Sequence, residues 1–330
     1  MPALYLMELG AIMGVEGECF KVSCRDVTST IPIIKVDSVL VFGGTQITTH
    51  AIAELLERDI PTTFLSSNGR YYGRLASTDT KAVELKVEQY KKLEDNGFRT
   101  SFAKACVKGK ILNSLYILKN LNRERKIPEV AEGIKRMYAI IGTLEEKDNL
   151  ESIRGCEGSA AAMYFSIIPL LLKNRFGFSG RNRRPPKDPL NSLLSFIYTL
   201  LMYSVYTAVS ITGLDPAIGY LHEYTDNRPA LPLDLMEEFR ALFADQVIID
   251  LINHSMIDED DFYEGETEDK PVLINTDLRR KVVERFEKRL STQVLYKGDN
   301  ISYRRVLEMQ ARSLVRYIRT GEPYTPFIQQ

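Results

Sequence analysis

The sequence predicts an α+β protein in which a small β-rich domain precedes a larger α-helical domain. Three observations indicate this fold class: a period-two alternation of apolar residues, an Asn-Gly hairpin signal, and a lasting change to a helical period. The change falls near residues 76–80, so we expect a β-rich domain over residues 1–76 and an α-helical domain over residues 77–330. A chain of 330 residues is also long enough for two hydrophobic cores.

The strand signals lie in the N-terminal part. Residues 32–42, PIIKVDSVLVF, alternate apolar and polar side chains, which is typical of a half-buried strand. Residues 62–75 place Asn68-Gly69 between two strand-like runs, so a β-hairpin is expected there. Residues 47–59 carry apolar side chains at helical spacing and predict a short amphipathic helix.

Beyond Leu75 the apolar residues recur at helical spacing. The expected helices span residues 79–92, 97–123, 127–143, 147–173, 190–212, 233–252, 275–292 and 301–320. The acidic run at 258–269 lacks the spacing of a calcium loop, so a solvated loop is expected.

Composition and cysteine usage indicate a cytoplasmic protein. The four cysteines form no CxxC pair and no zinc-like spacing, and the N-terminus lacks the basic region of a signal peptide. Residues 189–214 are uncharged and long enough to span a bilayer. Their hydroxyl side chains recur on every face, so we expect the central helix of a large core and no membrane anchor.

One histidine lies where carboxylates could join it. A lone histidine such as His222 is more often a packed side chain than a ligand. Asp234 and Glu237 project from one face of the first turn of a helix, where they could simply favour the helix dipole. Glu157 begins a long apolar helix face, where it could pair with Arg154 instead. Brought together, carboxylates and one imidazole would suit Mg²⁺ or Mn²⁺.

Residues 173–189, KNRFGFSGRNRRPPKDP, form a basic segment with six basic side chains and one acidic one. Arg181, Arg183, Arg184 and Lys187 could neutralise DNA phosphates, which would make binding sensitive to salt. The alternative is a solvated basic loop. The net charge of −1 gives no independent reason to expect nucleic acid.

Several motifs, in order along nearly the whole chain, resemble those of CRISPR-associated protein one, the integrase subunit that captures new spacers. They are RGCEGSAAAMYF, RNRRPPKDPLNSLLSFIYTLL, GLDPAIGYLH, LPLDLMEEFR and YTPF, preceded by the β-domain motif VDSVLVFGGTQITTHAIAELLERDIPTTFLSSNGRYYGRL. The resemblance implies that Glu157, His222 and Glu237 are metal ligands, with Asp234 beside them. Glu238 stands where the family often has proline, so a contact of Asp234 or Glu238 with the metal stays open.

The same resemblance implies a sandwich-like N-terminal domain that forms a homodimer, and a complex with CRISPR-associated protein two. The expected function is a metal-dependent DNA integrase and endonuclease. It would insert captured fragments into a CRISPR array by attack of a 3′-hydroxyl on a phosphodiester, and act on double-stranded and branched DNA. No GxxxxGK[ST] phosphate loop occurs, and this reaction needs no nucleotide cofactor. The alternatives are a generic metal-dependent phosphoesterase or nuclease, and an inactive DNA-binding structural dimer.

Overall fold

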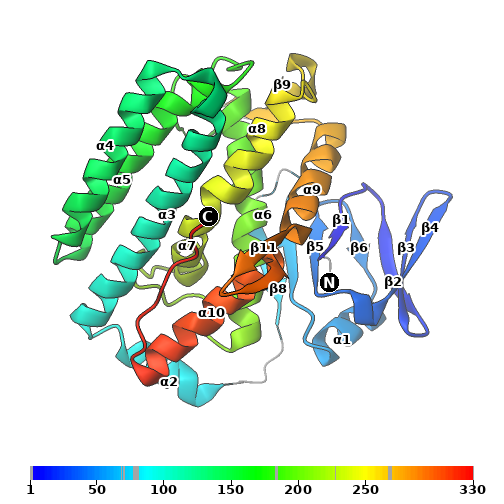
Figure 1. Ribbon diagram of the computed structural model, residues 1–330. Coiled ribbons are helices and arrows are strands. Elements are labelled where there is room, and N and C mark those ends of the chain that lie inside the picture. Colours follow the sequence, from blue (N-terminus) through cyan, green and yellow to red (C-terminus); the bar gives the residue numbers. More distant parts are fainter. Residues whose placement is uncertain are drawn as a thin grey trace. The chain divides into compact units, whose positions relative to one another are not determined.

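The chain forms two compact units, Met1–Lys81 and Ala82–Gln330 (Figure 1). In this computed structural model the described residues are 3–67, 69, 71–76, 82–182, 185–226, 228–266 and 270–329. The first unit is rich in β-strands and the second is mostly helical, so the predicted α+β fold class is confirmed.

Two sheets make up most of the described part of the first unit. The strands of the first sheet, in spatial order, are β1 (Ala3–Leu6), β5 (Ser38–Phe42), β7 (Thr62–Leu65) and β8 (Tyr71–Leu75). The strands of the second are β4 (Val27–Pro32), β3 (Cys19–Cys24), β2 (Ile12–Glu16) and β6 (Gln46–Ile47). Strands β1, β5 and β7 are parallel, whereas β7 and β8 form the expected antiparallel hairpin, with Asn68 outside the described residues.

One apolar cluster joins both sheets of the first unit to helix α1 (Thr49–Glu57). Leu6 and Val39 enter it from the first sheet, Met13 and Phe20 from the second, and Leu55 from the helix. The Thr48 hydroxyl caps α1 by accepting a hydrogen bond from a backbone N–H of the first turn. The amphipathic helix expected between the two strand regions is therefore confirmed.

The prediction of a single half-buried strand over residues 32–42 is wrong. Strand β4 ends at Pro32, residues Ile33–Lys35 form a 3₁₀ turn, and only Ser38–Phe42 form β5. Every residue of β5 is buried, and β1 and β7 pair with its two edges in parallel, which makes it a central strand of the sheet. A central parallel strand is buried on both faces and needs no alternation.

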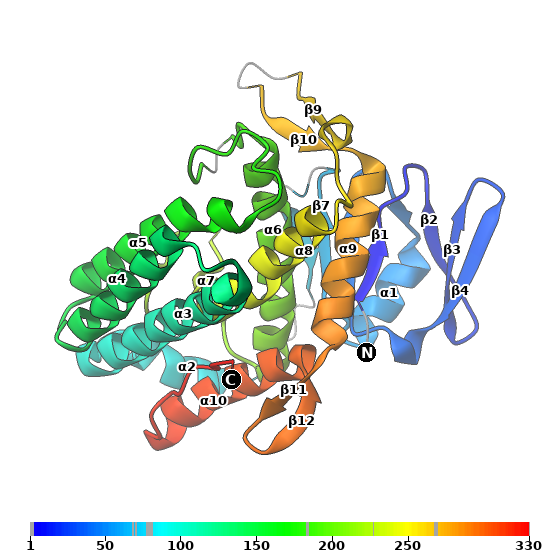
Figure 2. The ribbon, with the colours of Figure 1, turned by 45° about the horizontal axis from the view of Figure 1, so that its top comes forward.

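The second unit is built around long helices (Figures 1 and 2). Their bounds are α2 (Val83–Lys91), α3 (Asn96–Arg125), α4 (Pro128–Glu145), α5 (Leu150–Ile167), α6 (Pro189–Thr212), α7 (Ala230–Met236), α8 (Gln246–Asn253), α9 (Thr276–Ser291) and α10 (Tyr303–Thr320). Helices α3, α4 and α5 lie side by side, and α6 packs against α7 and α10.

Helix α6 is the expected uncharged helix. By length and composition it could cross a membrane, and half of its most apolar window is buried inside the protein. Leu193, Ile197 and Leu201 are fully buried on it. Asp188 caps its start and Gly213, at φ +82°, ends it.

Three helices differ most from their expected bounds. The helix expected over 79–92 forms α2 from Val83, and residues 79–81 lie outside the described residues. The helix expected over 147–173 ends at Ile167, and a 3₁₀ turn with Pro169 follows it. The helix expected over 233–252 starts at Ala230 and is interrupted by a 3₁₀ turn, Glu237–Phe239, and a π-helical segment, Ala241–Asp245.

Two small hairpins were not anticipated. Strands β9 (Phe262–Glu264) and β10 (Val272–Ile274) form the first, and β11 (Gln293–Tyr296) and β12 (Asp299–Ser302) form the second. The acidic segment at 258–269 therefore contains a strand where only a solvated loop was expected. Its residues 267–269 lie outside the described residues.

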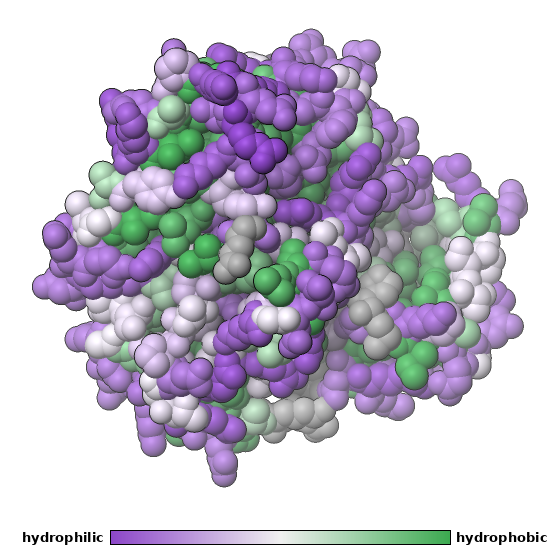
Figure 3. Space-filling model, in the orientation of Figure 1, coloured by the Kyte–Doolittle hydropathy of each residue, from purple (hydrophilic) through white to green (hydrophobic). Residues whose placement is uncertain are grey.

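The surface over α4 and α5 carries hydrophobic residues among hydrophilic ones (Figure 3). These two helices also form an open groove of about 500 Å³, with Gly133, Met163 and Ile167 among its lining residues.

Candidate active site

The imidazole of His222 lies between two carboxylates that come from one short helical segment. Its Nδ1 atom is 2.7 Å from Asp234 Oδ1, and its Nε2 atom is 3.8 Å from Glu237 Oε1. Asp234 and Glu237 are three residues apart, so both reach the ring from the same face, as expected from the sequence.

Asp234 is fully buried and anchors the backbone that carries His222. Its carboxylate accepts hydrogen bonds from the backbone N–H groups of Tyr220 (2.6 Å), Leu221 (2.9 Å) and His222 (2.8 Å). The absence of a side chain at Gly219 permits this approach, since a Cβ there would lie 2.8 Å from Asp234 Oδ2. The histidine ring and its loop are therefore oriented by one carboxylate.

Glu238 turns away from this site and holds the C-terminal segment. Its Oε1 atom accepts a hydrogen bond from the Tyr324 hydroxyl and its Oε2 atom one from Phe327 N, both at 2.5 Å. Gln310 Nε2 donates to the same carboxylate at 3.2 Å. Burial raises the pKa of Glu238 to about 7, although these hydrogen bonds lower it in part. The adjacent Glu237 and Glu238 thus serve different parts of the protein.

The irregular helix allows neighbouring carboxylates to diverge in this way. α7 gives way at Glu237 to a 3₁₀ turn, and the π-helical segment follows before α8 begins. Such local changes of helical geometry are frequent at functional sites because they re-aim side chains.

Glu157 lies in the middle of α5, whose first turn is capped by Asn149. Its side chain is 27% exposed. A Cβ added at the nearby Gly155 or Gly158 would meet no atom within 4 Å, so α5 is open at these two positions, which lie on a different side of the helix from Glu157. Arg154, the alternative partner of Glu157, instead donates to Leu221 O at 2.9 Å and contacts Glu223 at 3.1 Å.

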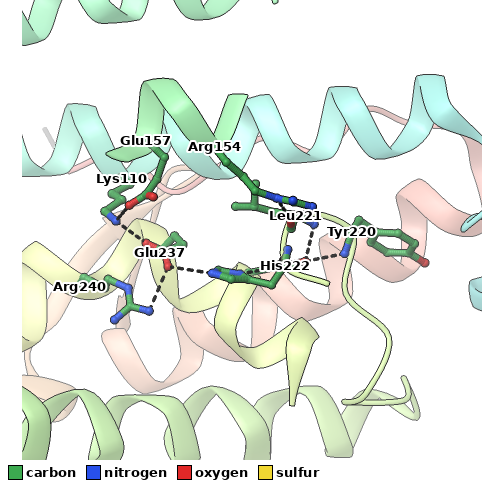
Figure 4. A network of polar contacts seen from close by, with 9 residues as sticks. Lys110, Arg154, Glu157, Tyr220, Leu221, His222, Glu237 and Arg240 are labelled. Carbon is green, nitrogen blue, oxygen red and sulfur yellow. Dashed lines mark hydrogen bonds and ion pairs between the residues drawn. The ribbon is translucent and has the colours of Figure 1, made fainter. Parts of the chain in front are cut away.

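Lys110 of α3 brings Glu157 and Glu237 together (Figure 4). Its ammonium forms an ion pair with Glu157 Oε1 and another with Glu237 Oε2, the latter at 2.7 Å. The preceding Gly109 allows α3 to pack closely, since a Cβ there would lie 2.7 Å from Pro326 and 3.1 Å from Glu238 Cβ. Lys110 is thereby fixed beside both carboxylates.

Glu237 is a buried carboxylate that forms ion pairs with both Lys110 and Arg240. Its side chain is 4% exposed, and Arg240 Nη2 lies 3.0 Å from its Oε1 atom. Burial alone would raise the pKa of the Glu237 carboxyl. The positive charges of Arg240 and Lys110, with His222, outweigh burial and hold this pKa well below its usual range. Glu237 is therefore a carboxylate around neutral pH.

The donor atoms present suit a hard divalent cation. Two carboxylates and an imidazole are ligand types for Mg²⁺ or Mn²⁺, and a second carboxylate on the other ring nitrogen is typical of metal-bound histidine. Glu237 Oε2 is buried without a well-directed hydrogen bond. Among the described residues, however, no three His, Cys, Asp or Glu side chains are gathered as ligands. Lys110 occupies the space between the two carboxylates.

The basic segment is only partly described. Arg181 Nη1 donates to Asn191 Oδ1 at 2.6 Å, and its guanidinium lies 5.5 Å from the centre of the Tyr198 ring. Lys187 is exposed, whereas Arg183 and Arg184 lie outside the described residues. The phosphate-binding role of these four residues stays a prediction.

Sequence reasoning missed Lys110 and Arg240 as members of this site. Lys110 lies on a helix with many basic residues and carries no motif of its own. Arg240 follows Glu237 by three residues, and this helical spacing could have indicated the pair.

Comparison with known proteins agrees with the fold. The profile of the family described as "CRISPR associated protein Cas1" matches residues 4–288. The CRISPR-associated endonuclease Cas1 3 of Thermus thermophilus is 35% identical over 330 residues, covering 98% of this chain and 96% of the relative.

Two solved structures extend this comparison. The structure titled "Cas6-RT-Cas1--Cas2 complex" matches with a TM-score of 0.87 and 25% identity, over 100% of this chain and 36% of that one. The structure titled "Casposase bound to integration product" matches with a TM-score of 0.85 and 25% identity, over 99% and 93% of the two chains.

The fold and these relatives define an enzyme of the endonuclease and integrase class. The chain belongs to the CRISPR-associated protein Cas1 family, and the resemblance noted in the sequence is confirmed.

Proposed function

We propose that this protein is a metal-dependent DNA integrase and endonuclease that inserts captured DNA fragments into a CRISPR array. The observation that carries the proposal is the convergence of Glu157, Glu237 and His222 from separate parts of the helical unit, with a cation between the two glutamates. The casposase relative, solved with an integration product, supports joining as well as cleavage.

Each side chain has a distinct role in this proposal. Glu157, Glu237 and His222 Nε2 would hold Mg²⁺ or Mn²⁺, and Asp234 keeps the imidazole oriented through Nδ1. When bound, the metal would polarise the scissile phosphodiester and stabilise the charge that develops on its oxygens. The open positions at Gly155 and Gly158 would leave room for a DNA backbone to approach α5.

The reaction exchanges one phosphodiester for another. A 3′-oxygen of the captured fragment forms a bond to phosphorus, the existing bond from phosphorus to a 3′-oxygen breaks, and the proton of the attacking hydroxyl passes to the leaving oxygen through solvent. Water in place of the attacking 3′-hydroxyl gives hydrolysis at the same site. The number of phosphodiesters does not change on joining, so no nucleotide cofactor is required.

The assembly belongs to the same proposal. We expect a homodimer formed through the N-terminal unit, in the cytoplasm, with double-stranded and branched DNA as substrates. CRISPR-associated protein two would bridge two such dimers, and the Cas1–Cas2 complex among the structural relatives supports this partner. Light scattering should report a mass near twice 37.6 kDa, and a monomer at micromolar concentration would contradict the dimer.

The decisive experiment incubates the purified protein with branched DNA and Mn²⁺ and measures strand joining on a denaturing gel. Joined strands that depend on Mn²⁺ and on Glu157 support the integrase. Hydrolysis without joining favours a generic nuclease or phosphoesterase. Binding without either reaction favours an inactive DNA-binding dimer.

A further inference from the structure

We propose that Lys110 is a resident cation, which holds Glu157 and Glu237 together in the metal-free protein and competes with the divalent metal for them. This inference rests on the proposed metal-dependent function and deepens it. Lys110 is a positioning residue in this scheme, because it acts on the metal site through the two carboxylates.

The contacts of Lys110 match those of a bound cation. Its ammonium forms ion pairs with Glu157 and with Glu237, which come from two different helical segments. The Lys110 side chain is 12% exposed and that of Glu237 is 4% exposed. An ion pair this well shielded from water interacts more strongly than a surface pair.

The ammonium stabilises a charge arrangement that would otherwise be unfavourable. A buried carboxylate without a compensating cation is costly, and two carboxylates that face one site also repel each other. Arg240 contacts only the Oε1 side of Glu237 among the ion pairs described, whereas Lys110 contacts Oε2 and Glu157. Lys110 is therefore the cation that joins the two glutamates.

A metal ion and the ammonium cannot occupy the same place. Carboxylate ligands approach Mg²⁺ or Mn²⁺ at about 2.1 Å, so a metal bound at the oxygens that Lys110 now contacts, Glu157 Oε1 and Glu237 Oε2, must replace the Lys110 contacts. Metal binding thus includes the breaking of two ion pairs, and the measured affinity is lower than the carboxylates and imidazole alone would give.

The protein provides a second place for the displaced ammonium. A cavity of about 30 Å³ lies beside Lys110, and its lining includes Ser114, Tyr164, Tyr198 and Asp245. This volume suits one water molecule, which is close in size to an ammonium group. The Tyr164 hydroxyl is buried without a well-directed hydrogen bond, and Asp245 is a buried carboxyl outside the described ion pairs. Both could accept a hydrogen bond from the relocated lysine.

The test compares Mn²⁺ binding by Lys110→Met with binding by the wild type, using isothermal titration calorimetry on protein freed of metal by a chelator. Lys108→Met is the matched control, because Lys108 lies on the same helix but forms an exposed ion pair with Glu145. We expect Lys110→Met to bind Mn²⁺ at least about tenfold more tightly and the control to match the wild type. Equal or weaker binding by Lys110→Met overturns the inference.

Thermal unfolding gives an independent readout, which does not depend on enzyme activity. Without metal, Lys110→Met should unfold at a lower temperature than the wild type, and saturating Mn²⁺ should stabilise it more than it stabilises the wild type. Lys110→Gln, which keeps a polar end group, should show the same two effects if the methionine variant does not fold. An equal gain from Mn²⁺ in the variant and the wild type also overturns the inference.

The outcomes separate this inference from the proposed function. If the wild type and Lys110→Met bind Mn²⁺ equally and Glu157→Gln binds none, the metal site stands and the competing role of Lys110 is wrong. If none of these proteins binds Mn²⁺, both proposals are wrong. If only Lys110→Met binds Mn²⁺ at the concentrations used, the competition is stronger than expected and both proposals are supported.

Discussion

Asp234 Oδ1 lies 2.7 Å from His222 Nδ1, and the same carboxylate accepts hydrogen bonds from three successive backbone N–H groups. The ring orientation and the loop conformation are therefore set by one buried side chain. Because Nδ1 is engaged by Asp234, Nε2 is the ring nitrogen that faces Glu237. This relationship gives Asp234 a role in folding and in the site at once.

Asp234→Asn should reduce both stability and activity. An amide nitrogen cannot accept the hydrogen bonds that the backbone N–H groups of Tyr220 and Leu221 now donate to Oδ2. The free energy of unfolding should therefore fall by about 2 kcal/mol. The loss of ring orientation should reduce strand joining by about 10- to 100-fold. Urea unfolding and a joining assay measure the two effects. Asp226→Asn, at an exposed position, is the control. Wild-type joining by Asp234→Asn would contradict the orienting role.

Glu157→Gln should separate activity from folding. The Glu157 side chain is 27% exposed and glutamine has nearly the same shape, so the substitution removes a carboxylate charge with little change in packing. We expect cleavage and joining to fall by more than about a hundredfold, with a free energy of unfolding within about 1 kcal/mol of the wild type. Glu151→Gln in the first turn of α5 is the control. Wild-type rates in Mn²⁺ would mean that the site is assigned incorrectly.

The neighbouring glutamates should give opposite phenotypes. Glu237→Gln should abolish joining, whereas Glu238→Ala should mainly affect folding, since it leaves Tyr324 and the Phe327 N–H without their buried acceptor. The expected loss of unfolding free energy for Glu238→Ala is about 3 kcal/mol. Denaturant unfolding and the joining rate per folded molecule distinguish the two. If Glu238→Ala were stable and inactive, Glu238 would be the better candidate for a ligand.

The divergence of these two residues shows where sequence reasoning ended. The residue types at Glu157, His222, Asp234 and Glu237 and their order were visible in the sequence. Which of two adjacent glutamates faces the site depends on the 3₁₀ and π-helical geometry of this segment, and helical periodicity cannot express that. The pairing of Lys110 with Glu157, across two helices, depends on tertiary packing and leaves no local pattern.

Much of the fold, in contrast, could be predicted, because local sequence patterns carry it. The amphipathic helix α10 and the hairpin of β7 and β8 carry strong local signals. The β11–β12 hairpin turns at Lys297 and Gly298, both with positive φ, and Lys-Gly is a weaker signal for such a turn than Asn-Gly. Strand β5 shows no alternation because its residues are buried on both faces of the strand.

Asp245 should make stability depend on pH. Burial raises the pKa of its carboxyl from 3.8 to about 6, although the Tyr198 hydroxyl donates to it at 2.8 Å. The folded protein thus holds this proton more tightly than the unfolded chain does. The resulting stabilisation is fully present below about pH 4 and is lost as the pH rises through about 6, a change of about 3 kcal/mol.

Asp245→Asn should remove this contribution. Unfolding by urea at pH 4 and pH 7 measures it as the change in the free-energy difference between variant and wild type. Other carboxylates titrate over the same range in both proteins, so only this difference reports on Asp245. If the difference stays constant between the two pH values, Asp245 does not have the raised pKa.

Arg183 and Arg184 offer a test between an integrase and a general nuclease. A nuclease needs a site, a groove and water, whereas an integrase must also hold a DNA 3′-end in line with a second phosphodiester. In the proposed function, the basic segment at 173–189 would supply phosphate-binding charge next to the sequence that leads into α6. Replacing both arginines with alanine should weaken DNA binding and reduce the slope of log affinity against log salt by about two.

Strand joining by this double variant should fall further than hydrolysis, because positioning of the 3′-end matters only for joining. The comparison uses one branched substrate and one simple duplex, with rates measured at the same Mn²⁺ concentration. Equal losses in both reactions would mean that the segment binds DNA without positioning its end. If neither reaction changed, the segment would be a solvated surface loop, and the phosphate contacts would have to come from other basic residues such as those of α3 and α9.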